Sequence, residues 1–522
     1  MFASVKTITF IGLSAFLTDV EVFLGSGLPK FDIVGLAAKA VQESKERVAA
    51  AIKKSGYKFH SGRITVNLAP TDLPKSGTSY DLPIAVAILA ASGQIKLKEK
   101  AIFWGSLSLS GETAKTRGAI AVAEAVLENG ELPLFLPEII AEEAGIIEGI
   151  TIKSVKSLAR LGEHFAGKEI PDLKFVRGKR VPGNASEYDF ADIKGQYQAR
   201  RAAEIAAAGG HNILLSGTPG SGKTFLARCI AGILPGMQFR EQLEVTKIYS
   251  LMGLLNTASL ISERPFRNPH HTCSQIALIG GGSNPRPGEV TLAHNGVLFL
   301  DEFSEFTTLS LETLRQPLED RLVNIARAGQ IVTFPAKFML VAATNPCKCG
   351  YRGDPERACK CSQLEIMRYE RKLSGPVLDR IELQINMHRV KQEQLSGAPA
   401  GETSAQIRDR VEEARTRQRQ RADKFGFKES VNAELNSKQI LASAALTQKA
   451  KQLLAQAGET LQISARSYFK LIKVSRTIAD FEQKEAVTEE HVAEAVSMRL
   501  SEAKIETVTE YQDKFRTSQG TH

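Results

Sequence analysis

The spacing of apolar residues divides the chain into three stretches of different character. Residues 1–165 mix strand-like alternation with helical periodicity, which predicts an α+β domain. In residues 190–387 short apolar runs alternate with helical segments, a pattern typical of a parallel sheet covered by helices on both faces. Residues 404–503 have helical periodicity alone. The pattern therefore predicts an α/β chain with a linker at 166–189, a connector at 388–403 and a short tail, 504–522.

Particular elements follow from the same pattern. Strands are expected at 5–10, 20–24 and 64–68, and helices at 41–52 and 82–91. Ser404 is the expected cap of the first helix in the C-terminal stretch.

One apolar run of the central stretch leads directly into a glycine-rich loop. Ile213-Leu214-Leu215 precedes a G-x-x-x-x-G-K-T motif, and a helical segment follows it. Strand, loop and helix in this order cradle nucleotide phosphates, because backbone N–H groups and the helix N-terminus face the anion. The lysine of the motif reaches the phosphates, and its threonine offers a hydroxyl to Mg²⁺. The expected ATP-binding residues are Gly217, Thr218, Pro219, Gly220, Ser221, Gly222, Lys223 and Thr224.

Two further apolar runs end in polar residues. The run at 297–300 leads into Asp301 and Glu302, and the run at 338–344 leads into Asn345. The carboxyl ends of parallel strands meet at the nucleotide edge of an open α/β sheet. Asp301 is therefore expected to hold Mg²⁺ together with Thr224, Glu302 to polarise the attacking water, and Asn345 to orient it. A turn-forming role before proline is the alternative for Asn345.

Four of the six cysteines form a C-x-C…C-x-C pattern: Cys347, Cys349, Cys359 and Cys361. Four thiolates brought together by a short loop suit tetrahedral Zn²⁺. The C-x-C spacing is tighter than the common C-x-x-C, so two disulfides or redox-active thiols remain alternatives. A structural zinc site that staples the loop after Asn345 is the preferred interpretation.

Composition narrows the class of protein only slightly. The chain has 522 residues, 43% of them hydrophobic and 24% charged, which is ordinary for a globular protein. No apolar stretch is long enough to span a membrane, and the N-terminus lacks the features of a signal peptide, so a cytoplasmic protein is expected. The net charge of +9 permits a nucleic-acid partner without requiring one.

Longer motifs place these features in a family. Arg264-Pro265-Phe266-Arg267-Asn268-Pro269-His270-His271 is followed by a second glycine-rich segment, 280–289, and by Leu292-Ala293-His294-Asn295-Gly296. In combination with the phosphate loop, this resembles the magnesium-chelatase-like branch of AAA+ ATPases, specifically the ComM/YifB family. The resemblance implies a ribosomal-S5-like N-terminal domain, related to those of Lon and RadA, then an AAA+ core and a C-terminal helical lid.

The resemblance also implies an active site shared between subunits. Arg380 lies where the family places an arginine finger, which a neighbouring subunit supplies to the transferred phosphoryl group. Arg466 lies at the sensor-2 position of the lid. A surface ion pair is the alternative role for each arginine. A finger supplied in trans implies a ring, and the family implies a homo-hexamer.

Two insertions are candidates for contact with DNA. One, from about 252 to 282, resembles the helix-2 insertion and carries Arg264 and Arg267. The other, from about 322 to 334, resembles the presensor-1 hairpin, with Arg327 near its tip. Cationic side chains on such loops bind the DNA backbone without sequence preference. Contacts between subunits are the alternative. A metal site at the adjacent histidines of the first insertion is disfavoured.

The N-terminal domain raises a rival function. The segment 75–85 resembles the part of Lon-type proteases that carries the nucleophile, and Ser79 lies near that position. The expected catalytic lysine falls at Ala119-Ile120 instead, with Lys115 displaced, so a non-proteolytic domain is expected.

The preferred function is an ATP-driven DNA helicase that promotes branch migration in homologous recombination and natural transformation, with ATP, Mg²⁺ and a structural Zn²⁺ as cofactors. A chelatase-like metal-insertion subunit and a Lon-like protein-remodelling or protease factor are the alternatives.

Overall fold

The computed structural model describes residues 1–130, 132–173, 188–255, 259–282, 285–327, 330–354, 356–373, 377–390, 401–460 and 463–499. Within these ranges the side chains of 327, 330 and 370–373 are not described. Most of the expected linker and connector, the tail and the side chain of Arg327 therefore lie outside the described residues. In the described part of the chain, no helix has both the length and the apolar character needed to cross a bilayer.

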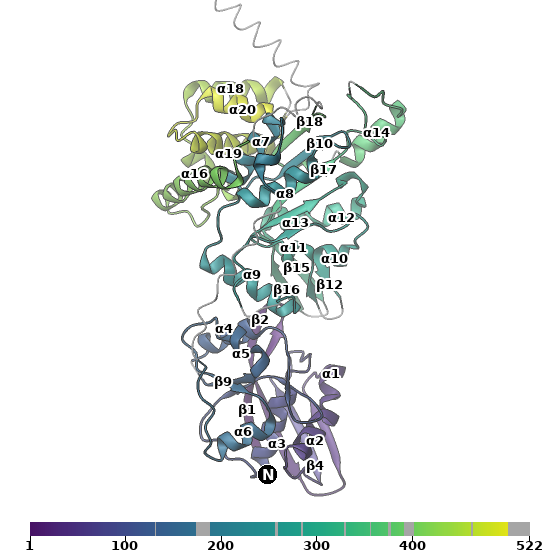
Figure 1. The fold of residues 1–522 in the computed structure, drawn as a ribbon, viewed down its shortest axis with the longest axis vertical. Coiled ribbons are helices and arrows are strands. Elements are labelled where there is room, and N and C mark those ends of the chain that lie inside the picture. The colour runs from purple at the N-terminus through teal and green to yellow at the C-terminus, as the bar shows by residue number, and fades with distance from the viewer. Residues whose placement is uncertain are drawn as a thin grey trace, which may run out of the picture. The chain divides into compact units, whose positions relative to one another are not determined.

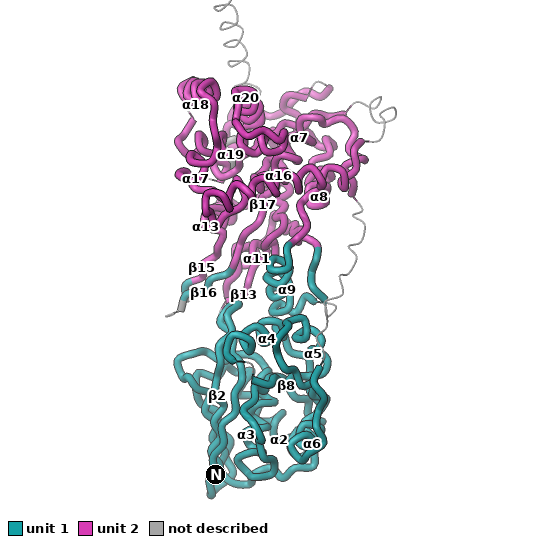
Figure 2. The backbone as a smooth tube through the Cα atoms, turned by 90° about the vertical axis from the view of Figure 1, so that its left-hand side faces the viewer, with its two compact units in different colours: residues 1–182, 238–262, 326–334 teal, residues 183–237, 263–325, 335–522 magenta. Residues whose placement is uncertain are grey.

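The chain forms two compact units, which Figure 2 shows in different colours. The first comprises residues 1–182, 238–262 and 326–334, and the second comprises residues 183–237, 263–325 and 335–522. Each unit contains a β-sheet with helices packed on it (Figure 1), which confirms the expected α/β class.

The sheet of the first unit has seven strands, in the order β3-β4-β2-β1-β5-β8-β9. β2 pairs antiparallel with β1 and with β4, and the other neighbours are parallel. The predicted strands and their alternating burial are confirmed: in β4, Ile64, Val66 and Leu68 are buried and the residues between them are not. The strands are β1 (Phe2–Ile11), β2 (Ser14–Gly25), β3 (Lys30–Val34), β4 (Arg63–Ala69), β5 (Ile102–Phe103), β8 (Leu134–Pro137) and β9 (Ile152–Val155), and a separate pair is formed by β6 (Ser106–Leu107) and β7 (Thr113–Ala114).

Helices pack against both faces of this sheet: α3 lies in one apolar cluster with Phe103 and Phe135, and α4 lies in a second cluster with Ile102 and Leu134. The predicted helix at 82–91 is α3, which is apolar all round because almost every one of its residues is buried. The predicted helix at 41–52 is present but breaks at Glu43 into α1 and α2. The helices are α1 (Lys39–Gln42), α2 (Ser44–Lys54), α3 (Asp81–Ala91), α4 (Ala119–Glu128), α5 (Glu138–Ala144) and α6 (Leu158–Phe165).

Helix α9 (Phe239–Met252) and the beginning of the first insertion are built into this unit. The helix packs on α4, where Lys247 pairs with Glu124. A Cβ atom on Gly118, just before α4, would lie 2.7 Å from a methyl group of Leu251, so the two helices are in close contact. Leu243 of α9, and Leu255 and Leu260 of the insertion, also pack against the apolar cluster of α4 and α5.

The sheet of the second unit is parallel throughout, as predicted, with five strands in the order β11-β14-β17-β10-β18. Its central strands are fully buried, which explains their continuous apolar sequence. The strands are β10 (Ile213–Gly217), β11 (Phe266–Arg267), β14 (Val297–Leu300), β17 (Met339–Thr344) and β18 (Leu383–Met387). Two-stranded sheets are formed by β12 (Gly280–Gly281) with β13 (Arg286–Pro287), and by β15 (Leu322–Arg327) with β16 (Gln330–Pro335), the expected hairpin.

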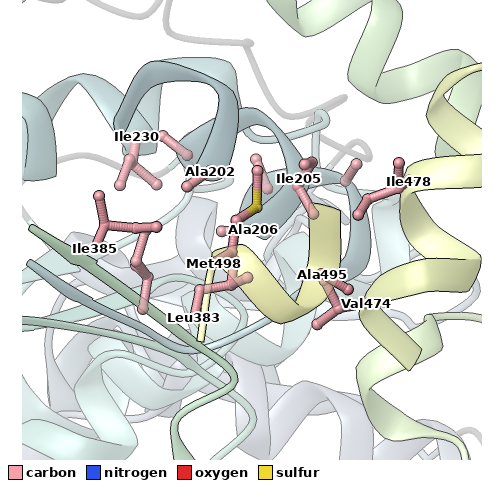
Figure 3. Packing of buried hydrophobic residues seen from close by; sticks show 14 of the residues in the cluster. Ala202, Ile205, Ala206, Ile230, Leu383, Ile385, Val474, Ile478, Ala495 and Met498 are labelled. Atoms are coloured by element: carbon pink, nitrogen blue, oxygen red, sulfur yellow. The ribbon is translucent and has the colours of Figure 1, made fainter. Parts of the chain in front are cut away.

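Small residues allow the C-terminal helices to pack closely on this sheet. Helix α7 (Tyr197–Gly209) presents a row of buried alanines, including Ala202 and Ala206, to its neighbours (Figure 3). Side chains from α8, β18, α19 and α20 meet them in one cluster. The remaining helices are α8 (Lys223–Ile233), α10 (Gln275–Ile279), α11 (Glu289–Leu292), α12 (Thr308–Thr313), α13 (Arg315–Asp320), α14 (Gln363–Leu373), α16 (Ser404–Phe425), α17 (Ser437–Ser443), α18 (Gln448–Thr460), α19 (Ala465–Phe481) and α20 (Glu489–Ser497), with short turns η1 (Phe190–Asp192), η2 (Phe303–Glu305), η3 (Leu378–Arg380) and η4 (Asn432–Glu434).

The cap of α16 differs from the sequence-based expectation. Thr403 caps the helix, and its hydroxyl accepts a hydrogen bond from the backbone N–H of Gln406 at 3.3 Å. Ser404 is already helical, and its hydroxyl accepts instead from the N–H of Phe190 at 2.9 Å. Either hydroxyl suits a cap, so the choice depends on a partner that is distant in sequence.

Candidate functional site

The phosphate loop joins β10 to α8 at the carboxyl edge of the sheet in the second unit. Gly222 precedes α8 with φ of 89°, a conformation that favours glycine. A Cβ atom on Gly217 would lie 2.4 Å from the carbonyl oxygen of Met387, so only glycine fits between the two strands. The N-terminus of an eleven-residue helix thus faces the loop, as phosphate binding requires.

Lys223 closes this loop. Its ammonium donates to the carbonyl oxygens of Gly217 at 2.7 Å and Thr218 at 3.0 Å, and to Asn345 Oδ1 at 3.3 Å. Burial lowers the pKa of Lys223, and the nearby Asp301 opposes that shift. The lysine is therefore held at the loop by weak neutral acceptors, which the oxygens of a phosphate can replace with stronger, charge-assisted bonds.

The expected magnesium ligands are brought together. Thr224 Oγ1 donates to Asp301 Oδ2 at 2.8 Å, although the two residues are 77 positions apart in the chain. A hydroxyl and a carboxylate at the phosphate loop are the hard oxygen ligands that Mg²⁺ prefers, so these residues fit the ion. The other carboxylate oxygen of Asp301 accepts from the N–H of Glu302 at 2.9 Å, which orients the carboxylate.

Asn345 lies beside Lys223 at the end of β17, between the ends of β10 and β14. A buried tyrosine, Tyr369 of α14, holds its backbone: the phenol donates to the carbonyl oxygen of Asn345 at 2.9 Å. The same hydroxyl lies 2.7 Å from Ser304 Oγ and 3.2 Å from Thr344 Oγ1. Tyr369 therefore links the chain after Glu302 to the chain at Asn345, a role that no sequence pattern indicated.

A second residue that the sequence analysis did not assign is His271. Its Nδ1 lies 3.0 Å from Glu302 Oε2, and its ring meets Phe306 edge-on. Glu302 has φ of 50° and is more than half exposed, so its carboxylate is fixed mainly by this contact. His270 stacks on His271 with ring centroids 4.2 Å apart but bonds Thr272 instead. His271 thus orients Glu302, the candidate catalytic base.

Arg380 lies at the opposite edge of the sheet from the phosphate loop. Its carbonyl oxygen accepts from Asn212 Nδ2 at 3.0 Å, and Asn212 directly precedes β10. The five residues from Asn212 to Gly217 span about 16 Å at about 3.3 Å per residue. This distance exceeds the reach of an arginine side chain, so Arg380 is not placed to contact a phosphate held by the Lys223 of its own chain.

Arg466 lies with Arg380 at this edge. One oxygen of Glu319 accepts from Arg380 at 2.8 Å and from Arg466 at 2.6 Å. Next to them, Arg499 connects the C-terminal helices to the sheet: it donates to the carbonyl oxygen of Ile381 at 2.9 Å and to Ser467 Oγ of α19 at 2.9 Å. The two arginines predicted for separate roles therefore form one positively charged site around a shared carboxylate.

A buried ion pair supports this edge. Glu382 pairs with Lys470 of α19 at 2.9 Å and accepts from the N–H of Asn212 at 2.8 Å. Burial would raise the pKa of Glu382, but Lys470 and the bond from Asn212 outweigh burial and hold the pKa at about 2. Burial lowers the pKa of the adjacent His211 to about 3, so that ring is neutral; its Nε2 lies 2.8 Å from Thr477 Oγ1.

The four clustered cysteines converge as predicted. Their sulfur atoms all lie within 4.8 Å of one another, and three of the pairs are 3.4, 3.5 and 3.7 Å apart. Four thiolates on one zinc ion at about 2.3 Å would be about 3.8 Å apart, so the donor set and its spacing fit tetrahedral zinc. All six cysteines are free thiols, so the structure does not contain the alternative pair of disulfides.

The arginines predicted to contact DNA have partners inside their own unit. Arg267 forms a two-pronged pair with Glu289 at 2.6 and 2.8 Å. Arg264 donates to the carbonyl oxygens of Pro235 and Asn295, each at 2.7 Å. These contacts give both residues a structural role at β11, while DNA contact remains a prediction. The side chain of Arg327 lies outside the described residues.

The protease alternative gains no support at Ser79. Within the described residues, the hydroxyl of Ser79 makes no hydrogen bond to a lysine or histidine, and Ala119 and Ile120 are buried at the start of α4. Lys115 is exposed. A serine without a base nearby is not activated as a nucleophile.

Comparison with known proteins gives matches along most of the chain. Residues 189–395 match the family model described as magnesium chelatase, subunit ChlI; residues 20–139 match subunit ChlI of Mg-chelatase, and residues 401–499 its C-terminal part. YifB of Escherichia coli is 40% identical over 95% of this chain and 96% of its own. Competence protein ComM of Haemophilus influenzae is 41% identical over 94% and 96%. Lon protease 2 of Bacillus subtilis is 31% identical over 30% of each chain.

Proposed function

The chain belongs to the ComM/YifB family of magnesium-chelatase-like AAA+ proteins, and on that premise we propose that it is an ATP-hydrolysing ring motor that acts on DNA. More specifically, the proposed activity is a helicase that promotes branch migration during homologous recombination of incoming DNA. The relative from Haemophilus influenzae carries the name competence protein, and competence is the capacity of a cell to take up DNA. The net charge of +9 is compatible with such a partner.

The observation that carries the proposed ATPase is the meeting of three strand ends. Two hydrogen bonds join these strand ends: Lys223, in the segment after β10, donates to Asn345 after β17, and the adjacent Thr224 donates to Asp301 after β14. In the proposed mechanism Lys223 binds the phosphates, and Thr224 with Asp301 holds the Mg²⁺ that neutralises their charge when it is bound. Glu302 accepts the proton of the attacking water, and Asn345 orients that water.

The proposed ring follows from the position of the arginines. Arg380 and Arg466 share Glu319 at the amino edge of the sheet, about one strand length from the phosphate loop of their own chain. Both would serve the nucleotide of a neighbouring copy, which is a head-to-tail contact. Such contacts close into a ring when the rotation permits, and the family suggests a homo-hexamer.

Zinc at the four cysteines belongs to the same proposal. The convergence of four free thiols with spacing close to that of a ZnS₄ site supports it. Protein purified without chelator is expected to contain zinc, and a zinc-free, fully folded protein would contradict this part.

The decisive experiment measures ATP hydrolysis with and without single-stranded DNA or a four-way junction, and unwinding of that junction. We expect DNA to stimulate hydrolysis, and Lys223→Ala to abolish hydrolysis and unwinding. Lys424→Ala, which removes an exposed lysine at the end of α16, is the control and should behave as wild type. Absence of both DNA binding and stimulation would remove the DNA motor from consideration.

The same preparation tests the two rivals. The match to magnesium chelatase favours a subunit that drives metal insertion, which would require a partner protein and a macrocyclic substrate to stimulate hydrolysis. The match to Lon protease 2 favours a protease-linked factor, for which casein degradation lost in Ser79→Ala is the expected signature.

A further inference from the structure

The cysteine loop packs directly against the phosphate loop. Gly350, between the two C-x-C pairs, has φ of 85°, and a Cβ atom built on it would lie 2.9 Å from the ring of Pro219. The same Cβ would lie 3.9 Å from Asn345 Cγ. Cys347 is two residues beyond Asn345 and is buried. A displacement of the cysteine loop would therefore move either Pro219 of the phosphate loop or Asn345.

The other end of the cysteine segment reaches the catalytic strands through α14. This helix begins at Gln363, two residues beyond Cys361, and Ser362 and Glu365 cap its start: Ser362 N–H donates to Glu365 at 3.0 Å, and Glu365 N–H donates to Ser362 Oγ at 3.3 Å. Two turns later, the buried phenol of Tyr369 bonds the backbone of Asn345 and lies 2.7 Å from the hydroxyl of Ser304. Ser304 is two residues beyond Glu302.

The four sulfur atoms connect the segment that contacts Pro219 to the segment that leads to Tyr369. Cys347 and Cys349 lie on the arm that touches Pro219, and Cys359 and Cys361 lie on the arm that leads into α14. Across the arms, Cys349 N–H donates to Cys361 Sγ at 3.3 Å, and the sulfur atoms of Cys349 and Cys359 are 3.5 Å apart. Free thiols make only weak hydrogen bonds with one another, so a bound metal would fix both arms, whereas thiols without metal would leave the arms free to separate.

We infer that a zinc ion bound by the four cysteines controls the rate of ATP hydrolysis, because it fixes Asn345 and the phosphate loop from one side and Tyr369 from the other. The zinc site is thus a positioning element of the active site and not only a staple of its own loop. Loss of zinc or oxidation of the thiols would lower turnover while nucleotide binding through Lys223 persists. This inference rests on the proposed ATPase activity.

The test compares three variants of the full chain: Cys361→Ser, Tyr369→Phe and the control Cys273→Ser. For each, the zinc content, the affinity for ATP and the kcat for hydrolysis are measured. We expect Cys361→Ser to lose zinc and at least about tenfold in kcat, with ATP affinity changed much less. Tyr369→Phe should keep zinc but lower kcat, since it deletes only the hydroxyl. Cys273 lies outside the cluster, so Cys273→Ser should have the zinc content, ATP affinity and kcat of the wild-type protein.

The outcomes separate the inference from the proposal on which it rests. A folded, zinc-free Cys361→Ser protein with wild-type kcat would overturn the inference alone, as would a Tyr369→Phe protein with unchanged kcat. If Cys361→Ser fails to fold, wild-type protein stripped of zinc by a chelator takes its place, and an unchanged kcat in that folded, zinc-free protein would likewise overturn the inference. A wild-type protein that binds zinc and ATP but hydrolyses nothing, with or without DNA, would contradict the proposed function itself.

Discussion

Substitution of Arg380 tests whether the active site lies within one chain or is shared between neighbouring chains. Its backbone lies beside Asn212, about 16 Å along β10 from the phosphate loop, so removal of its side chain leaves the nucleotide-binding residues of the same chain untouched. We expect Arg380→Ala to bind ATP with nearly wild-type affinity. An arginine finger contributes about 10³–10⁵ in rate, so kcat should fall by about that factor, or about 4–7 kcal/mol in barrier height.

Mixing two inactive variants makes the test sharper. Lys223→Ala lacks the phosphate-binding lysine but keeps Arg380, and Arg380→Ala has the converse defect. In a randomly mixed ring, about one head-to-tail interface in four joins an intact Lys223 to an intact Arg380. ATP hydrolysis by the equimolar mixture should therefore exceed the sum of the separate variants by far. Arg240→Ala, at an exposed arginine of α9, is the control.

Two results would refute this reasoning. Arg380→Ala with wild-type kcat would show that the arginine has only its structural partner, Glu319. A mixture no more active than its two components, under conditions where the variants are shown to assemble together, would show that the two residues do not meet across an interface.

Further predictions concern histidines of the second unit. His271→Ala should lower kcat about tenfold with little change in KM, because it frees the side chain of Glu302; complete loss of a general base would lower the rate about 10²–10⁴-fold. His270→Ala is the matched control, and equal effects of the two variants would contradict the role of His271. Burial holds the pKa of His211 near 3, so below about pH 6.5 the unfolded chain binds a proton that the folded unit does not. The contribution of His211 to the free energy of unfolding should therefore be fully present above about pH 6.5 and decrease by about 1.4 kcal/mol per pH unit between about pH 6.5 and pH 3. Equilibrium denaturation should show a weaker dependence on pH in His211→Gln, and the same dependence in both proteins would contradict this prediction.

The parts of the site that follow from local sequence were predictable. A phosphate loop is a strand, a turn and a helix in immediate succession, and Gly217, Gly222 and Lys223 are fixed by that geometry. Asp301 and Asn345 follow buried strands, and a parallel sheet necessarily brings such strand ends together. The fold class and the convergence of the four cysteines were predictable for the same reason, since spacing along the chain determines both.

The partners of individual side chains were not predictable, because they depend on which distant elements meet. Nothing in the sequence distinguishes His271, which reaches Glu302, from His270, which does not. From the sequence, Arg264 and Arg267 look like exposed cations on an insertion. In the structure Arg264 donates to the carbonyl oxygens of Pro235 and Asn295, and Arg267 pairs with Glu289. Helix α9 presents a similar case, since its apolar residues have no visible partner until α4 is placed beside them.

The shared carboxylate of Glu319 changes how the two arginines are understood. Separate roles for a finger and a lid sensor would place the guanidinium groups of Arg380 and Arg466 at different nucleotides. One oxygen of Glu319 accepts from both, at 2.8 and 2.6 Å, which places the two guanidinium groups side by side instead. Because this place lies about a strand length from the phosphate loop of the same chain, we expect a single subunit to bind ATP and Mg²⁺ through Lys223, Thr224 and Asp301 but to lack the arginines that stabilise the charge of the transition state. ATP binding should then require only one chain, whereas ATP hydrolysis should require the interface between two chains. We therefore expect kcat, but not the affinity for ATP, to depend on the concentration of subunits.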